Sequence, residues 1–216
     1  MRGLILPFDS ASPPRILCLG AHSDDIEIGC GGSILRLLAS SQQLDVTWAV
    51  FSSSEERKEE ACHSSELFLS QAFRKEIIVS DFRDGFFPFE GAKIKDAFEG
   101  LKRVSPDVVF THNRKDAHQD HRLLAELTWN TFRNHLILEY EIPKYDGDLG
   151  QPNIFVPLEQ AIYEKKVSYL MEAFGTQHGK RWFERETFLA LMRLRGMECN
   201  APSGYAEAFY SRKLVI

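Results

Sequence analysis

Four short and nearly continuous apolar runs, separated by stretches with helical periodicity, constrain the fold of this 216-residue chain more than any other feature. Strands that are covered on both faces of a sheet have this composition, and each intervening stretch repeats its apolar residues at the spacing of one helix face. The runs are residues 15–19, 46–51, 76–79 and 107–111, and the helical stretches are 32–40, 55–73 and 92–104. Repeated strand–helix units predict an α/β fold with a doubly wound, mostly parallel sheet that carries helices on both faces.

The remaining third of the chain is less regular, but nothing in it marks a second domain. We expect a helix from about 120 to 132, a strand at 136–142, helices at 159–173 and 184–194, and a final strand at 208–216. Residues 143–157 are rich in Pro, Gly, Asp and Asn, which predicts a loop that serves as a lid or as the wall of a pocket. Without an internal repeat or a linker, the sequence predicts a single domain over residues 1–216.

Charge and hydropathy exclude several classes of protein. The chain has 26 Lys and Arg against 31 Asp and Glu, a formal net charge of -5, and no basic stripe interleaved with aromatics, so we expect no nucleic-acid partner. No window holds the ~18 apolar residues that a membrane span needs, and residues 1–9 contain too short an apolar run for a secretory signal. The scattered cysteines match neither a zinc element nor a disulfide framework, which favours reduced thiols and a cytoplasmic protein. These cysteines are Cys18, Cys30, Cys62 and Cys199.

A cluster of one imidazole and two carboxylates follows the first apolar run. His22 and Asp25 are three residues apart in a turn that leads toward a helix, a spacing that lets a nitrogen and an oxygen converge on one ion. Asp24 then lies beside that ion and is available as a base. A helix-capping role stays open for either aspartate alone.

Three glycines follow this turn, Gly29, Gly31 and Gly32, and predict a tight bend before the helix begins. Their spacing is not the Gly-x-Gly-x-x-Gly fingerprint of a dinucleotide site, and acidic residues occupy the place of the pyrophosphate. A dinucleotide-dependent oxidoreductase is therefore disfavoured.

A second polar cluster follows the fourth apolar run and comprises His112, Asp116, His118, Asp120 and His121. A position near the start of a helix favours the neutral form of histidine, which binds metals, and an adjacent Asp orients an imidazole. Taken alone, this run is equally typical of a protein surface. Because ligands bind at the carboxyl ends of the strands in such sheets, we expect the two clusters to meet, and we predict a mononuclear metal hydrolase.

The paired motifs resemble those of the PIG-L/LmbE-like family of zinc-dependent de-N-acetylases, the GlcNAc de-N-acetylase family. The resemblance rests on residues 21–27 with Gly31 and Gly32, and on residues 111–121. It implies a Rossmann-like fold and hydrolysis of an N-acetyl group on an amino sugar or its conjugate, nucleotide sugars and biosynthetic intermediates included. It also implies a Zn2+ cofactor, although another divalent metal such as Fe2+ stays open.

The same resemblance implies roles for individual residues. The implied metal ligands are His22, Asp25 and His121. Asp24 is the implied general base, and Asp120 supports a histidine. His118 is implied to steady the oxyanion or to protonate the leaving amine.

Three further residues are candidate contacts to the substrate. Arg57 matches an Arg-x-x-Glu element of the family and is implied to grip the polar end of the substrate. Asp84 and His112 are the other two candidates, although a plain turn role stays open for Asp84. Two positions depart from the family pattern, with Ser23 in place of a proline and Phe174 in place of a histidine. Residues 136–216 are expected to form part of the substrate pocket.

Alternatives from other classes stay open at this point. They are another metal-dependent amidohydrolase, a phosphoesterase, and a catalytically inactive module that binds a sugar. A two-metal phosphoesterase needs more carboxylate ligands than the two clusters supply, and a binding module has no use for the spare carboxylate of Asp24. The expected partner is a small N-acetylated sugar. No pattern in the sequence indicates the oligomeric state, and a homo-oligomer stays open.

Overall fold

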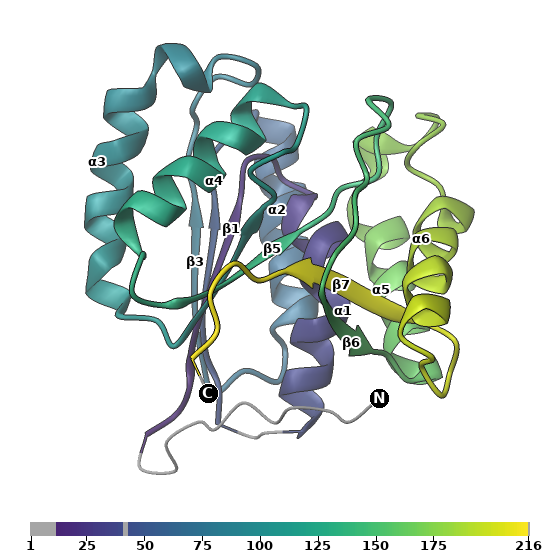
Figure 1. Ribbon diagram of the computed structural model, residues 1–216. Coiled ribbons are helices and arrows are strands. Elements are labelled where there is room, and N and C mark those ends of the chain that lie inside the picture. Colours follow the sequence, from purple (N-terminus) through teal and green to yellow (C-terminus); the bar gives the residue numbers. More distant parts are fainter. Residues whose placement is uncertain (1–11, 41–42, 216) are drawn as a thin grey trace.

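A seven-stranded sheet forms the centre of the computed structural model, which describes residues 12–40 and 43–215 (Figure 1). The strands lie in the order β3-β2-β1-β4-β5-β7-β6. Their bounds are β1 Arg15–Gly20, β2 Asp45–Val50, β3 Arg74–Val79, β4 Val108–His112, β5 Leu136–Tyr140, β6 Ile154–Pro157 and β7 Ala206–Tyr210. Strands β1 to β5 are parallel, whereas β7 pairs antiparallel with both β5 and β6. The predicted mostly parallel, Rossmann-like sheet is confirmed.

Helices cover both faces of this sheet. Helices α1, α2 and α5 pack together on one face, α3 and α4 pack on the other, and α6 lies against β7 (Figure 1). Their bounds are α1 Asp25–Ser40, α2 Glu55–Phe68, α3 Gly91–Leu101, α4 Gln119–Thr131, α5 Gln160–Ala173 and α6 Arg185–Glu198. Residues of β1 alternate between the two cores, with Ile16 and Cys18 in one and Leu17 and Leu19 in the other. Burial on both faces explains why Ile16 to Leu19 are all apolar.

Helix α1 begins at Asp25 and not at the predicted residue 32. The glycines therefore lie inside the helix, where they let large side chains approach its backbone. A Cβ added to Gly29 would lie 2.2 Å from Cδ2 of Tyr140, and one added to Gly31 would lie 2.6 Å from Cε1 of Phe68. The predicted bend before the helix is wrong, because the glycines serve close packing instead of a turn.

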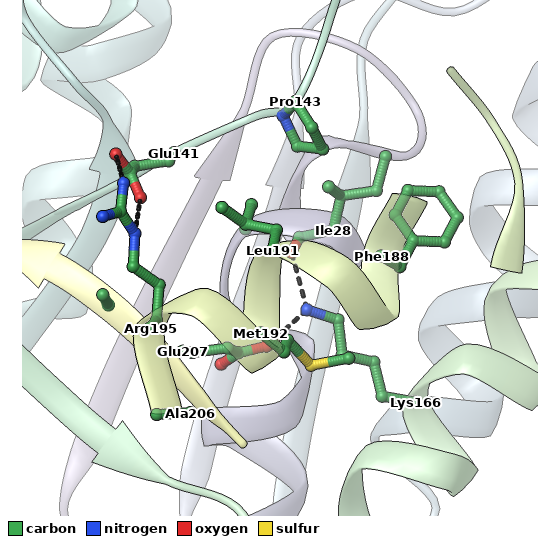
Figure 2. Close-up of a pocket in the computed structure, with 12 residues that line it drawn as sticks. Ile28, Glu141, Pro143, Lys166, Phe188, Leu191, Met192, Arg195, Ala206 and Glu207 are labelled. Atoms are coloured by element: carbon green, nitrogen blue, oxygen red, sulfur yellow. Dashed lines mark hydrogen bonds and ion pairs between the residues drawn. The ribbon is translucent and has the colours of Figure 1, made fainter. Parts of the chain in front are cut away.

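A buried ion pair ties α1 to the C-terminal part of the chain (Figure 2). Nζ of Lys166 in α5 donates to the backbone carbonyl of Ile28 at 2.6 Å and to Oε1 of Glu207 at 2.5 Å. Glu207 in β7 accepts the backbone N–H groups of Gly32 and Ser33 at 2.7 Å each. Loss of either charge would leave the other buried and uncompensated. The pair therefore holds α1, and with it the polar turn that precedes α1.

Two boundaries in the last third differ from the sequence predictions. β6 lies inside the predicted loop 143–157, because Gly150 and Pro152 before it and Pro157 at its end hide its short apolar run from pattern analysis. β7 covers Ala206–Tyr210 and not 208–216, since its ladder with β6 begins where Ala206 faces Pro157.

Some expectations concern residues outside the described part of the chain, namely the absence of a signal in residues 1–9 and the last position of the predicted final strand, Ile216. Within the described residues, no helix combines the length and the apolar character that crossing a bilayer requires.

The two polar clusters follow neighbouring strands. β1 and β4 pair in parallel from Ile16 with Val108 to Cys18 with Phe110, so the turns after both strands lie at one edge of the sheet. The chain then enters α1 on one face and α4 on the other. In doubly wound sheets, the crevice at such a switch point holds ligands.

Candidate metal centre

The three predicted metal ligands meet beyond the carboxyl ends of β1 and β4. Nδ1 of His22 lies 3.1 Å from Nε2 of His121 and 3.3 Å from Oδ2 of Asp25. Nε2 of His121 lies 3.6 Å from the same oxygen of Asp25. All three side chains are buried. The structure thus brings together two turns that are far apart in the chain.

The spacing of these three atoms fits a small divalent cation. Zinc bound tetrahedrally by nitrogen and oxygen at about 2.0–2.1 Å separates its donor atoms by roughly 3.3 Å. The three distances in the structure, 3.1, 3.3 and 3.6 Å, lie close to that value. Imidazole and carboxylate donors together suit zinc and several other divalent transition metals. The residues therefore fit a mononuclear metal site.

Carboxylates orient both histidines through the second nitrogen of each ring. Nε2 of His22 lies 3.0 Å from Oδ1 of Asp84 and 3.5 Å from Oδ2 of Asp120, and Nδ1 of His121 lies 3.0 Å from Oδ2 of Asp116. An ionised carboxylate only accepts hydrogen bonds, so the hydrogen bond to Asp116 places the ring proton of His121 on Nδ1. Nε2 of His121 then keeps a free lone pair toward Nδ1 of His22, and a metal held between the two rings would replace the proton that they otherwise share.

The electrostatic surroundings favour the metal-binding forms of His121 and Asp25 and oppose that of His22. Burial and repulsion from His112 lower the pKa of His121 to about 4. Burial alone raises the pKa of Asp25, but the imidazoles of His121 and His112 outweigh it and hold the pKa well below its usual value. Burial lowers the pKa of His22, but hydrogen bonds to carboxylates, first of all Asp120, raise the pKa well above its usual value. A cation at Nδ1 of His22 competes with that proton.

His112, the last residue of β4, lies beneath the ligand set and is fully buried. Its Nε2 accepts the backbone N–H of Ala21 at 3.0 Å and lies 3.2 Å from Oδ2 of Asp25. Its ring stacks on that of His121, with centroids 3.9 Å apart. Together with Asp25 and His121, it forms one of three groups among the described residues that could hold a metal. The other two are His22 with His118 and His121, and His22 with Asp84 and Asp120. Because His112 is fully buried, a substrate cannot touch it, so the structure does not support His112 as the predicted substrate contact.

Asp24 lies beside the ligand set with one oxygen held and the other free. Its Oδ1 is 3.0 Å from Nη2 of Arg57, whereas its buried Oδ2 has no hydrogen-bond partner among the described residues. Burial raises the pKa of Asp24, and the positive charge of Arg57 opposes that rise. A carboxylate with a raised pKa and a free oxygen has the properties of a general base.

Arg57 reaches Asp24 from the first turn of α2, which is capped by the side chain of Ser54. Its side chain is 20% exposed. One turn later, Glu60 accepts the backbone N–H and the hydroxyl of Thr176 at 2.7 and 2.6 Å. This contact fixes α2 against the segment after α5. The structure therefore gives Arg57 a partner that the sequence did not indicate.

The N-terminus of α4 positions His118 and Asp120. The side chain of His118 caps the helix, and its Nδ1 accepts the backbone N–H of Asp120 at 3.3 Å. Because a backbone N–H only donates, Nδ1 is unprotonated and Nε2 carries the ring proton. Asp120 is fully buried and accepts the backbone N–H groups of Gly85 and Phe87 at 2.7 and 3.1 Å. It joins the loop after β3 to the imidazole of His22.

Asp84 stands at the open rim of the site. Its Oδ1 lies 3.0 Å from Nε2 of His22, yet its side chain is 65% exposed. The hydrogen bond with His22 outweighs partial burial and lowers the pKa of Asp84, so the carboxylate is ionised at neutral pH. Its exposed oxygen is available to accept hydrogen bonds from a molecule that enters the site.

Asp116 is a member of the predicted cluster to which sequence reasoning assigned no role. Its Oδ2 faces both Nδ1 of His121 and, at 2.9 Å, Nζ of Lys144. Burial alone raises the pKa of Asp116, but the hydrogen bond with His121 and the nearby positive charges outweigh it and lower the pKa. The short distance between His112 and Asp116 in the sequence could have indicated that Asp116 orients a histidine of the site.

Two further residues were missed altogether. Lys144 lies in a stretch rich in Pro, Gly and Asp, where no pattern distinguishes a paired lysine from a solvated one. Tyr140 at the end of β5 donates to the backbone carbonyl of Leu19 at 2.6 Å, and its hydroxyl lies 3.3 Å from Nε2 of His112. In the sequence, Tyr140 reads only as part of an apolar strand.

Comparison with known proteins identifies a family model and several structures of the same fold. Residues 17–132 match the PIG-L model, described as GlcNAc-PI de-N-acetylase. A conserved protein of Thermus thermophilus superposes with a TM-score of 0.72 at 23% identity, over 93% of this chain and 95% of that one. The N,N'-diacetylchitobiose deacetylase of Pyrococcus horikoshii gives a TM-score of 0.69 at 21% identity, over 91% and 83% of the two chains.

The same fold also serves a different reaction. GalB, the 4-carboxy-2-hydroxymuconate hydratase of Pseudomonas putida KT2440, superposes with a TM-score of 0.71 at 18% identity, over 94% of this chain and 98% of that one. Structural likeness at these identities shows a shared fold and leaves the chemistry to the site. The family match, in contrast, includes both polar clusters.

Proposed function

Because the chain belongs to the PIG-L (GlcNAc-PI de-N-acetylase) family, we propose that it is a metal-dependent N-deacetylase that acts on an amino sugar or an amino-sugar conjugate. One observation carries the proposal. Three donor atoms at tetrahedral spacing lie next to a carboxylate, that of Asp24, with one oxygen held by Arg57 and the other unpartnered among the described residues. A site that only bound a metal would not need this additional carboxylate.

The metal would be held by Nδ1 of His22, Oδ2 of Asp25 and Nε2 of His121. When bound in such a site, a divalent cation acts as a Lewis acid toward a carbonyl and lowers the pKa of water from ~15.7 toward ~7. Zinc suits this donor set best, and Fe2+ is the alternative.

Asp24 acts as the general base of the reaction. Its free Oδ2 takes a proton from the attacking water, while Arg57 holds Oδ1 and so fixes the direction of the free oxygen. The water oxygen bonds to the acetyl carbon, the C–N bond breaks, and the amine leaves with a proton that the Asp24 carboxyl group is placed to return. A well-placed general base contributes about 10²–10⁴-fold to the rate.

His118 serves the side of the site opposite Asp24. Its Nε2 carries the ring proton because Nδ1 is engaged as the cap of α4, so the ring donates a hydrogen bond to the oxygen on which charge develops. Removing one donor of this kind costs roughly 10²–10³-fold in turnover. Its ring lies edge-on to that of His22, with centroids 5.0 Å apart, which supports a position at the reacting groups. Asp120 acts through His22, whose Nε2 it faces.

Sugar recognition falls to Asp84 and to the exposed part of Arg57. Asp84 accepts hydrogen bonds from sugar hydroxyls at the rim, and Arg57 contacts polar groups of the substrate beside Asp24.

The C-terminal third completes the pocket of a single domain, because the loop after β5 reaches the turn that carries His118. The contact that supports this is the backbone N–H of Ala117, which donates to Oδ2 of Asp148 at 2.6 Å. His112 supports the ligand set from below.

Acetate release is the direct test of this proposal. Zinc-loaded protein is incubated with a panel of N-acetylated amino sugars, their conjugates and nucleotide sugars, and both acetate and the freed amine are measured. We expect equal amounts of acetate and amine from at least one member of the panel. Phosphate release from phosphoesters, or tight sugar binding without acetate release from any member, would replace the proposal with one of the competing functions.

A further inference from the structure

Lys144 is a largely buried cation that lies one carboxylate away from the ligand set. It belongs to the loop that follows β5, and its side chain is 12% exposed. Its Nζ lies 2.9 Å from Oδ2 of Asp116 and donates to both carboxylate oxygens of Asp148 at 2.8 and 2.6 Å. Asp148 also accepts the backbone N–H of Ala117 at 2.6 Å. Lysine is seldom buried unless it is paired, and here two carboxylates pair with it, next to a longer hydrogen bond to the backbone carbonyl of Ile142 at 3.4 Å.

Asp116 connects this cation to a metal ligand. The oxygen that faces Lys144 is the same Oδ2 that lies 3.0 Å from Nδ1 of His121. The other oxygen, Oδ1, accepts the backbone N–H of His118 at 2.8 Å. A metal-binding histidine is oriented by whatever its second nitrogen contacts. The position of the Asp116 carboxylate therefore sets the orientation of His121, and Lys144 is one of the groups that set the position of the carboxylate.

The loop that carries Lys144 is itself anchored at its base (Figure 2). Arg195 of α6 contacts both oxygens of Glu141, with Nε 2.9 Å from Oε2 and Nη2 2.8 Å from Oε1. The same Nη2 donates to the backbone carbonyl of Gly150 at 3.0 Å. Of the two roles that the sequence left open for this loop, lid or wall, these contacts favour a fixed wall.

We propose that Lys144 is a positioning residue for the metal site, which fixes the carboxylate of Asp116 and through it the metal-binding imidazole of His121. The inference rests on the metal site of the proposed function. Removing an outer partner of a ligand histidine typically weakens metal binding by about 10–100-fold. Lys144 reaches the same histidine through one intervening carboxylate, so its loss acts on metal affinity even though it never contacts the metal.

The rival explanation is that Lys144 only fastens the loop to the turn before α4. A fastening of this kind contributes to the stability of the fold, and its loss lowers the melting temperature. It does not change how tightly an intact site holds a metal. Metal affinity, measured on folded protein, therefore separates the two explanations.

The test compares Lys144→Met, which removes the charge and keeps a long side chain, with Lys144→Arg, which keeps the charge. Lys115→Met is the matched control, because Lys115 is exposed and precedes Asp116 directly in the chain. Zinc affinity is measured by competition with a chromogenic chelator. The absorption spectrum of each Co2+-substituted protein reports on the geometry of the site, and the melting temperature of each metal-free protein reports on folding.

We expect Lys144→Met to bind zinc more weakly than the wild type, by up to about 10-fold, the lower end of the range for a direct partner of the ligand, and to show a changed Co2+ spectrum. Lys144→Arg should recover most of the affinity, and Lys115→Met should match the wild type. Unchanged affinity and spectrum in Lys144→Met, with normal zinc binding by the wild type, would overturn the inference and leave the proposed function intact. A wild type that binds no metal would overturn both.

A second variant covers the case in which Lys144→Met does not fold. Asp148→Asn loosens the hold on Lys144 without altering Asp116 or His121. We expect it to weaken zinc binding in the same direction and by a smaller factor. A folded Asp148→Asn protein with wild-type zinc affinity and a wild-type Co2+ spectrum would then overturn the inference.

Discussion

Nδ1 of His22 lies 3.1 Å from Nε2 of His121, although 99 positions separate the two residues in the chain. The other nitrogen of each ring faces a carboxylate, that of Asp116 for His121 and those of Asp84 and Asp120 for His22. Two free lone pairs approach this closely only when a proton or a metal cation is shared between them. With Oδ2 of Asp25 next to both atoms, the arrangement is one that a divalent cation stabilises.

Asp24→Asn tests the general base. The amide keeps the size of the side chain but lacks an oxygen that can accept a proton from water, and all three ligand residues remain. We expect kcat for acetate release to fall by about 10²–10⁴-fold, while the zinc content stays at the wild-type level. Asp81→Asn, at an exposed position after β3, serves as the control. Loss of zinc from Asp24→Asn would make Asp24 a ligand instead of the base.

Arg57 sets the pH range in which Asp24 can act. Its positive charge opposes the rise in pKa that burial causes, so removing the charge raises the pKa of Asp24 further. A base works only in its deprotonated form. The acidic limb of the pH profile of kcat/KM should therefore move to higher pH in Arg57→Met and return toward the wild type in Arg57→Lys. A higher KM with an unmoved limb would show that Arg57 contacts only the substrate.

Glu27 makes the stability of the fold depend on pH. It is fully buried in α1, and burial raises its pKa well above the usual value of 4.5. The folded protein keeps a proton that the unfolded chain releases, so the contribution of Glu27 to stability is largest below pH 4.5 and falls as the pH rises toward the pKa of the folded state. Glu27→Gln has no proton to release and lacks this dependence.

The measurement is urea unfolding of metal-free wild type and Glu27→Gln across a series of pH values. We expect the free energy of unfolding of Glu27→Gln, relative to the wild type, to increase with pH by up to about 1.4 kcal/mol per unit. Titrating groups away from Glu27 are common to both proteins and cancel in the difference. A difference that stays constant above pH 5 or so would contradict the raised pKa.

Gly29 is required for close packing of α1 against β5. A Cβ at this position would lie 2.2 Å from the ring of Tyr140, which is held by its hydrogen bond to the carbonyl of Leu19. We expect Gly29→Ala to lower the free energy of unfolding by about 1–3 kcal/mol. Gly100→Ala in α3 is the matched control, because no atom lies within 4 Å of an added Cβ there. It should stabilise the protein by up to about 1 kcal/mol, and equal effects at both positions would refute the packing role.

Local patterns in the sequence predict the sheet and the members of the polar clusters. Ile16 to Leu19 are apolar because both faces of β1 are covered, and that burial leaves a direct trace in composition. The proximity of three ligand residues can also be predicted, because parallel strands end at one edge of the sheet whichever residues fill its core. These residues are His22, Asp25 and His121.

Features that depend on packing between distant segments leave no such trace. Helix α1 starts at Asp25 although glycines have low helix propensity, because their contacts with Tyr140 and Phe68 outweigh that propensity. The burial of His112 depends on Tyr140 and on the ligand set, and the role of Lys144 depends on where its loop meets the turn before α4. None of these contacts is encoded by spacing along the chain.

The metal content of His121→Ala tests the central claim most directly. Wild type and variant are loaded with zinc, freed of excess metal by dialysis, and analysed by mass spectrometry for zinc per chain, with the exposed His178→Ala as control. We predict stoichiometric zinc in the wild type and in His178→Ala, and its loss from folded His121→Ala. Equal zinc in wild type and His121→Ala, or none in the wild type, would contradict the proposed metal centre.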